Sequence, residues 1–255
     1  MRHLRWLYVY WSVVMAGLTV IIASFFDPIR AEELLPFSLS GGRLVTMVAS
    51  PPFLVCLAAT ALAIGFARRH WARAGGLSAT DKMVVLWFVM NATWFHVGCD
   101  AFSGLFQVMP NLTEAYRVMN PNHWQPMHHV DRVALDMVYW FELLVQMPLC
   151  WLAAWMCLKR APGRHIVIAF LSGLHLTGTV AYYAPNALLG HTFHPLMSNL
   201  DRAFGVLWII IPTALTIRAI RQLDESQPVA VPAATPLGID EGEAALPAPV
   251  PSGSP

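Results

Sequence analysis

Six long apolar blocks constrain the fold of this chain more than any other feature. A helix needs about 20 mostly apolar residues to cross the hydrocarbon core of a bilayer. Blocks of about this length lie at residues 6–26, 44–67, 84–108, 133–158, 165–186 and 203–222. Only 12% of the residues are charged, which is about half the share in an ordinary soluble domain. The sequence therefore predicts an all-α, polytopic membrane bundle with six transmembrane helices.

The basic residues between these blocks predict an orientation. Cytoplasmic loops of membrane proteins carry an excess of lysine and arginine. Of the 16 such residues, five lie in the segments predicted on one side: Arg30, Arg43, Arg117, Arg132 and Arg202. The other eleven lie in the segments that include the two ends of the chain. Both termini are therefore predicted to be cytoplasmic, in the endoplasmic reticulum of a eukaryote or the inner membrane of a bacterium.

The blocks also predict an organisation along the chain. Residues 1–43 hold the first span and its loop, 44–83 the second span and a cytoplasmic loop, and 84–225 the last four spans. Residues 226–255 contain seven prolines and no aromatic residue. Such a segment buries too little apolar surface to offset its chain entropy. We predict a disordered cytoplasmic tail.

Ionisable residues inside the predicted spans are the strongest functional clue, because a charge at mid-bilayer costs roughly 2.5–3.5 kcal/mol. His96 and Asp100 are four residues apart, hence on one helical face. An acid beside a histidine can fix its tautomer and suits proton transfer. The pair could equally be a polar clamp between helices.

Glu142 lies about two turns into the fourth block. A carboxyl group held protonated in an apolar site can act as an acid. The simpler interpretation pairs Glu142 with His175 or another buried donor. Trp208 in the sixth block could line a site, pack in the core or face lipid. Further candidates for binding a substrate are Trp94, Tyr139, His175, Thr179 and Tyr183, although Tyr182 and Tyr183 also fit an aromatic belt at the membrane boundary.

The cysteines and the loop histidines carry weaker signals. The four cysteines lie within spans and show no CxxC spacing: Cys56, Cys99, Cys150 and Cys157. We interpret them as small apolar packing residues rather than disulfide partners or metal ligands. Five histidines lie in the later loops: His123, His128, His129, His191 and His194. Clustered histidines can bind a metal, but the helical spacings of metal motifs are missing, so no metal site is predicted.

Three stretches together resemble the EXPERA family, which includes the emopamil-binding protein, a sterol Δ8–Δ7 isomerase, and the sigma-two receptor. Residues 94–100 resemble the isomerase's histidine with an acid four residues on. Residues 142–148 are very similar to the family's Glu-Leu-x-x-Gln-x-Pro run, closest to the sigma-two branch. His194-Pro195, followed by Leu207-Trp208 and Pro212, resembles the isomerase's last span. The resemblance covers residues 84–222.

The resemblance implies roles for these residues. His96, Asp100 and Glu142 would be catalytic and move protons on a sterol, and Trp208 would face a cationic intermediate. Double-bond transposition needs no redox cofactor, so none is expected. The expected partners are a sterol or terpenoid lipid, cationic amphiphilic ligands and the membrane, with no nucleic acid; monomer and homodimer both stay open. The chain departs from the isomerase pattern at three positions: Asp100 replaces a glutamate, Val145 a polar residue and Gly205 an asparagine.

Three functions fit these observations. The leading one is an intramembrane isomerase that shifts a carbon–carbon double bond through a carbocation. The second is a non-enzymatic binder of sterols or cationic amphiphiles, in which the acids neutralise a ligand amine. The third is a proton-coupled transporter, which the lack of an inverted repeat disfavours. The proline pair Pro51-Pro52 predicts a kink in the second span that is not repeated elsewhere.

Overall fold

A computed structural model describes residues 15–30, 33–38, 41–73, 76–120, 123, 129–190 and 194–225 of the chain. Helices dominate these residues, and their only β-pairing is an isolated antiparallel bridge between Phe26 and Phe37. The predicted all-α class is therefore confirmed. The predicted disordered tail and the first half of the predicted first span lie outside the described residues.

Four described helical stretches are long and apolar enough to cross a membrane: Pro51–Ala72, Arg132–Lys159, Arg164–Leu188 and Pro195–Glu225. They correspond to the second, fourth, fifth and sixth predicted spans, and they make the chain a multi-pass membrane protein. The prediction of six spans is thus confirmed for four. The described part of the first block is the short apolar helix Met15–Phe25. The third block is helical as far as Leu105, but polar residues such as Asn91 and His96 interrupt its apolar sequence.

The second and third predicted spans are not single continuous α-helices. The second block is divided into α2 (Gly41–Val48) and α3 (Pro51–Arg73). The prolines therefore begin a new helix and do not kink a continuous one, because proline lacks a backbone N–H and fits the first helical turn. The third block forms α4 (Ala79–Met90) and the π-helix η2 (Asn91–Leu105). A short 3₁₀ turn, η1 (Pro28–Arg30), precedes them all.

In the second half of the chain, the described residues also lie mainly in helices, one of them interrupted by a π-helical turn. Helix α5 (Pro110–Met119) leads to α6 (His129–Phe141), the π-helical turn η4 (Glu142–Gln146) and α7 (Met147–Lys159). Arg160 at the end of α7 has a left-handed backbone, and so does Gly163 before the next helix. The last elements are α8 (Arg164–Leu189), α9 (Pro195–Gly205) and α10 (Leu207–Glu225).

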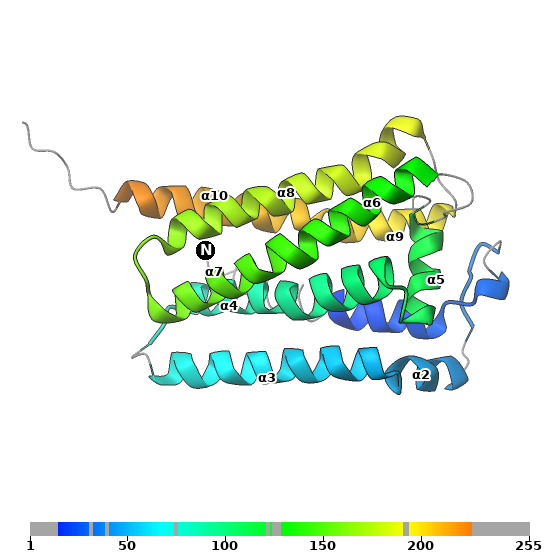
Figure 1. The fold of residues 1–255 in the computed structure, drawn as a ribbon, viewed down its shortest axis with the longest axis horizontal. Helices are drawn as coiled ribbons and strands as arrows, with labels where there is room; N and C mark the ends of the chain where they lie inside the picture. Colours follow the sequence, from blue (N-terminus) through cyan, green and yellow to red (C-terminus); the bar gives the residue numbers. More distant parts are fainter. Residues whose placement is uncertain are drawn as a thin grey trace, which may run out of the picture. The chain divides into compact units, whose positions relative to one another are not determined.

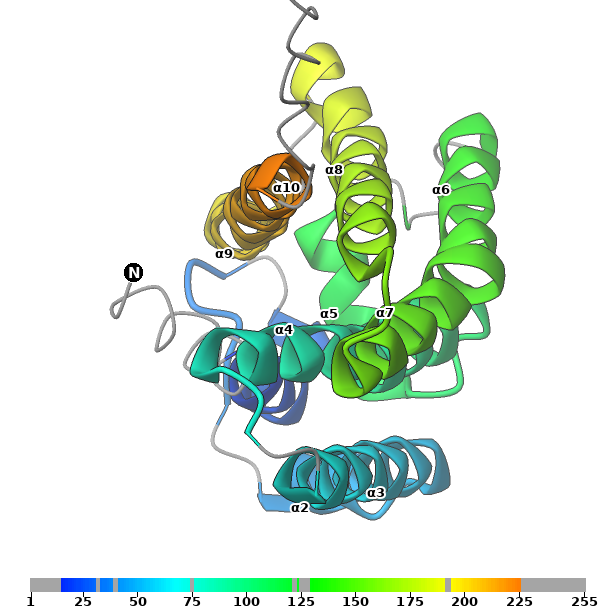
Figure 2. The ribbon, with the colours of Figure 1, turned by 90° about the vertical axis from the view of Figure 1, so that its left-hand side faces the viewer.

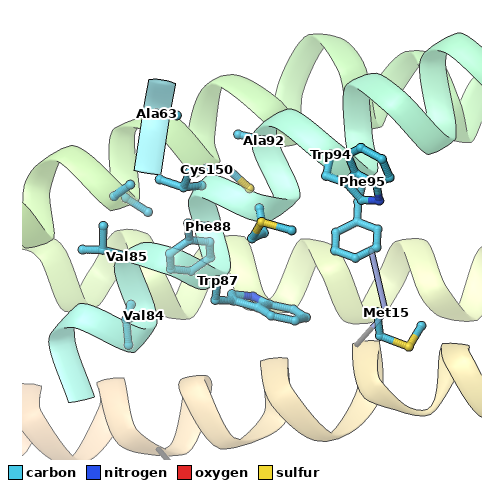
Figure 3. Close-up of a cluster of buried hydrophobic side chains, with 14 of the residues drawn as sticks. Met15, Ala63, Val84, Val85, Trp87, Phe88, Ala92, Trp94, Phe95 and Cys150 are labelled. Atoms are coloured by element: carbon cyan, nitrogen blue, oxygen red, sulfur yellow. The ribbon is translucent and has the colours of Figure 1, made fainter. Parts of the chain in front are cut away.

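The packing of the bundle places the third block at its centre. Helices α8 and α10 run side by side, α7 packs on α4, and α3 packs on η2 (Figures 1 and 2). Six of the seven residues from Val84 to Met90 are buried, so α4 is enclosed by its neighbours. Figure 3 shows its side chains in one apolar cluster with Trp94 and Phe95 of η2. The π-helix η2 continues directly from α4, so its polar side chains lie inside the bundle.

Candidate functional site

A cavity lies inside the bundle beside η2. It encloses about 900 Å³ of empty space, counting the part that is open to the outside. All predicted site residues except one line it: His96, Asp100, Tyr139, Glu142, His175, Thr179, Tyr183 and Trp208. They come from η2, α6, η4, α8 and α10, so the fold brings together residues that are far apart in the sequence. Ligand sites in membrane bundles are built between helices in this way.

Trp94 is the predicted residue that does not line this cavity. Its ring packs edge-on against Phe53 with the ring centroids 5.7 Å apart, and the side chain is buried. Since η2 winds as a helix, His96 and Trp94 two residues apart point in different directions. Trp94 therefore contributes to the contact between η2 and α3.

His96 and Asp100 make the contact that their spacing predicts. The Nδ1 atom of His96 lies 3.1 Å from Oδ2 of Asp100. Glu142 joins them from η4, and one ligating atom from each of the three side chains lies within 4.8 Å of the other two. Both motifs lie on π-helical backbone, which is rare and is often found at functional sites. The centre of the cavity thus holds two carboxyl groups and one imidazole.

A glycine on α8 leaves space for the Gln146 side chain. A Cβ atom at Gly178 would lie 3.6 Å from Oε1 of Glu142 and only 3.2 Å from Nε2 of Gln146. Gln146 is buried, one turn after Glu142 in the same motif. The small residue therefore lets the backbone of α8 approach the side chain of Gln146. Gln146 was missed as a cavity residue, although its place in the Glu-Leu-Leu-Val-Gln motif is a signal that could have found it.

The simpler interpretation of Glu142 pairs it with His175. Among the contacts of the described residues, His175 faces other groups instead. Its Nε2 atom faces Nε2 of His96 at 3.4 Å and Sγ of Cys150 at 3.7 Å. Thr179 donates its hydroxyl hydrogen to the carbonyl oxygen of His175, at 2.8 Å. The cavity wall on α8 therefore presents an imidazole close to that of His96.

Trp208 has a defined orientation at the edge of the cavity. Its indole N–H donates to Oδ1 of Asn91 at 3.1 Å, and Phe95 packs against the ring edge-to-face with centroids 4.8 Å apart. Asn91 was not predicted as a site residue, and a buried asparagine in an apolar helix is the signal for it. Asn91 on η2 thus fixes the orientation of Trp208. The asparagine that the isomerase pattern has at position 205 is replaced by glycine.

Tyr183 fills the space left by the glycine at position 205. A Cβ atom at Gly205 would overlap the ring of Tyr183. The hydroxyl of Tyr183 donates to the backbone carbonyl oxygen of Asp201 at 2.7 Å. Tyr182 lines the cavity as well, so both tyrosines belong to the site. Further lining residues that the sequence analysis missed are Cys99, Tyr116, Asp201 and Phe204.

Two of the loop histidines have structural partners. His123 is buried, with Nε2 2.9 Å from the hydroxyl of Tyr139 and Nδ1 3.5 Å from a guanidinium nitrogen of Arg132. His194 accepts a hydrogen bond from the backbone N–H of Met197 and so caps α9. Neither His123 nor His194 belongs to a group with metal-binding geometry among the described residues. His128 and His191 lie outside those ranges.

The fold and the site define a class of protein, a multi-pass helical membrane protein with an acid-bearing cavity inside its bundle. Residues 108–219 match the family model described as EXPERA (EXPanded EBP superfamily), and this part of the chain is an EXPERA domain. The match includes Glu142 and Trp208 but begins after His96 and Asp100, so it is narrower than the predicted range. No curated protein matches the chain.

Proposed function

We propose that this protein is an intramembrane isomerase that shifts a carbon–carbon double bond in a sterol or a related terpenoid. One observation carries the proposal: His96, Asp100 and Glu142 converge within 4.8 Å in a cavity that is otherwise lined largely by aromatic and aliphatic side chains. The EXPERA domain supports it, since Glu142 and Trp208 lie within the matched residues.

The proposed reaction moves one proton on to the substrate and another off it. Glu142 protonates one alkene carbon, which leaves a tertiary carbocation on the neighbouring carbon. The His96–Asp100 pair then removes a proton from an adjacent carbon, and the electron pair of that C–H bond forms the new double bond. The substrate keeps its composition and oxidation state, so neither an oxidant nor a reductant takes part.

The geometry also provides a way to reset the site. After one turnover Glu142 has lost a proton and the His96–Asp100 pair has gained one. The carboxyl groups of Glu142 and Asp100 lie within 4.8 Å of each other, so the proton can return between them directly or through one water.

Aromatic rings protect the proposed cation. A tryptophan ring face stabilises a nearby cation by about 2 kcal/mol in a desolvated site. Trp208 borders the cavity, and its indole N–H is already occupied by Asn91. The apolar lining also keeps out water, which would trap the carbocation as an alcohol.

The test is a turnover assay on membranes that contain the protein. A Δ8 sterol is added, and its isomers are separated and identified by mass spectrometry. We expect a Δ7 product from the unmodified protein, and a loss of about 10²–10⁴-fold in rate for Glu142→Gln and for His96→Ala. Glu114→Gln is the matched control, because Glu114 pairs with Arg117 and does not line the cavity. Full activity of either site variant would overturn the assignment.

A second function is favoured by the same two carboxyl groups. In a binding protein they would act as counter-ions for the amine of a cationic amphiphile. This function predicts saturable binding of such a ligand, weakened in Glu142→Gln, together with no sterol conversion. The turnover assay separates the two functions.

A further inference from the structure

Two imidazole nitrogens from the wall of the cavity and a thiol converge on the side of His96 away from Asp100. They are Nε2 of His96, Nε2 of His175 and Sγ of Cys150, and all three atoms lie within 4.8 Å of one another. The three residues come from η2, α8 and α7, and each is at most 2% exposed. Figure 3 shows Cys150 beside the apolar side chains of α4.

Two of the three separations between these atoms match the edges of a tetrahedral metal site. With metal–nitrogen bonds near 2.05 Å and a metal–sulfur bond near 2.3 Å, a tetrahedral ion separates two nitrogens by about 3.3 Å and a nitrogen from a sulfur by about 3.6 Å. The observed separations are 3.4 Å between the two Nε2 atoms and 3.7 Å between Nε2 of His175 and Sγ of Cys150. The separation between the two nitrogens is long for a hydrogen bond.

The tautomer of His96 also suits a ligand. Asp100 lies 3.1 Å from Nδ1 of His96, and a ring proton on Nδ1 that it accepts would leave a lone pair on Nε2. A carboxylate that orients a metal-binding histidine through its other nitrogen is a common feature of zinc sites. His175 is buried, and its Nδ1 has no hydrogen-bond partner among the described residues.

We propose that His96, His175 and Cys150 bind a divalent ion of the zinc type, with Asp100 orienting His96 and a water molecule completing the coordination. Two imidazoles and one thiolate are ligands that zinc prefers, and three protein ligands with one open position are typical of zinc sites that react or exchange. This goes beyond the proposed isomerase activity and does not depend on it. It gives Cys150 a role that its place in an apolar span does not indicate.

Cobalt(II) added to the purified full-length protein is the probe, because a tetrahedral Co²⁺ ion bound by a thiolate shows a charge-transfer band that nitrogen and oxygen ligands do not produce. We expect this band to appear and to saturate at one ion per chain. Cys150→Ala should abolish the band, and His175→Ala should weaken binding strongly. The matched control is Cys157→Ala, since Cys157 is also buried on α7 and belongs to neither metal-binding group.

The positioning role of Asp100 has its own readout. Asp100→Asn should retain the thiolate band but weaken cobalt binding about 10–100-fold. Zinc should compete with cobalt for the site. Failure of the unmodified protein to show the band would overturn the proposal, and so would a band that survives in Cys150→Ala. Cobalt bound without a thiolate band would instead assign the ion to the oxygen-rich set of His96, Asp100 and Glu142, and would also refute the proposed site.

The effect on turnover distinguishes this site from the proposed isomerase. A bound ion occupies Nε2 of His96, so added zinc should inhibit sterol conversion, and Cys150→Ala should convert sterol without this inhibition. Absence of turnover in all variants would refute the isomerase but leave the cobalt result standing. Equal inhibition of the unmodified protein and Cys150→Ala would refute the metal site.

Discussion

At the residue scale, the contact between Gly205 and Tyr183 shows how the site depends on small side chains. The ring of Tyr183 occupies the space that a Cβ atom at Gly205 would need, and its hydroxyl is held by Asp201. The asparagine of the isomerase pattern would not fit here without displacing that ring. The departure at position 205 is therefore matched by an aromatic residue on the facing helix, α8.

This contact predicts that Gly205→Ala destabilises the protein. Overpacking a close contact costs about 1–3 kcal/mol, so the midpoint of thermal unfolding in detergent should fall. Gly173→Ala on α8 is the control, because a Cβ atom there has no neighbour within 4 Å. It should be neutral or stabilising by up to about 1 kcal/mol, since alanine favours a helix over glycine. Equal effects of the two substitutions would show that the ring of Tyr183 is not the cause.

Single residues also show what the sequence could predict about the site. The contact between His96 and Asp100 follows from their spacing on one helix, and the glutamate follows from its motif. The approach of His175 and Cys150 to His96 could not be predicted, because the three residues lie on different helices. Only the packing of those helices brings them together.

At the scale of elements, the two π-helical segments are the main feature that the sequence did not predict. The long apolar blocks at residues 84–108 and 133–158 indicate helix but do not distinguish π-helical from α-helical hydrogen bonding. Gly104 in η2 marks a close contact with α6, since a Cβ atom there would lie 2.6 Å from the ring of Tyr139. Close approach of η2 and α6 thus requires a glycine at this position.

An ion pair joins the beginning of α4 to α10 and gives a prediction about pH. Arg218 donates to Oδ1 of Asp81 at 2.6 Å, and Ser78 donates to the other carboxylate oxygen. Burial alone raises the pKa of Asp81, but the hydrogen bonds from Arg218 and Ser78 outweigh it and hold the pKa below its ordinary value of 3.8. Asp81 precedes the predicted third span and lies outside the apolar block.

Because the pKa of Asp81 is lower in the folded protein than in the unfolded one, the pair stabilises the fold above the unfolded value. This contribution is lost as the pH falls through the lower, folded value. Asp81→Asn should therefore reduce stability by about 1 kcal/mol near neutral pH. The difference from the unmodified protein should shrink below about pH 4. Thermal unfolding across this range measures it, and a difference independent of pH would contradict the assignment.

At the scale of the whole molecule, the apolar blocks were the most reliable guide. Four of the six predicted spans are long apolar helices in the structure, and the third is a central helix whose polar residues build the site. The polar residues of that block make it less apolar, and the same residues are the ones that carry the candidate chemistry. The orientation in the membrane remains a prediction from the basic residues.

The predicted orientation places both ends of the chain and the turn at residues 160–163 in the cytoplasm. Reporter domains fused after residue 225 and at the N-terminus should both be active only on the cytoplasmic side. A single cysteine introduced at Ala161, in a background without the other cysteines, should resist a membrane-impermeant thiol reagent in intact cells. Labelling of that cysteine from outside would reverse the orientation.

Complementation in living cells tests whether the cavity isomerises a sterol double bond. The chain is expressed in cells that lack the Δ8–Δ7 sterol isomerase, its presence in the membrane is verified, and the cell sterols are analysed by mass spectrometry. We predict that Δ7 sterols reappear with the unmodified chain and with Glu114→Gln but not with Glu142→Gln. An unchanged sterol profile, with the protein present in the membrane, would contradict the claim of sterol isomerisation.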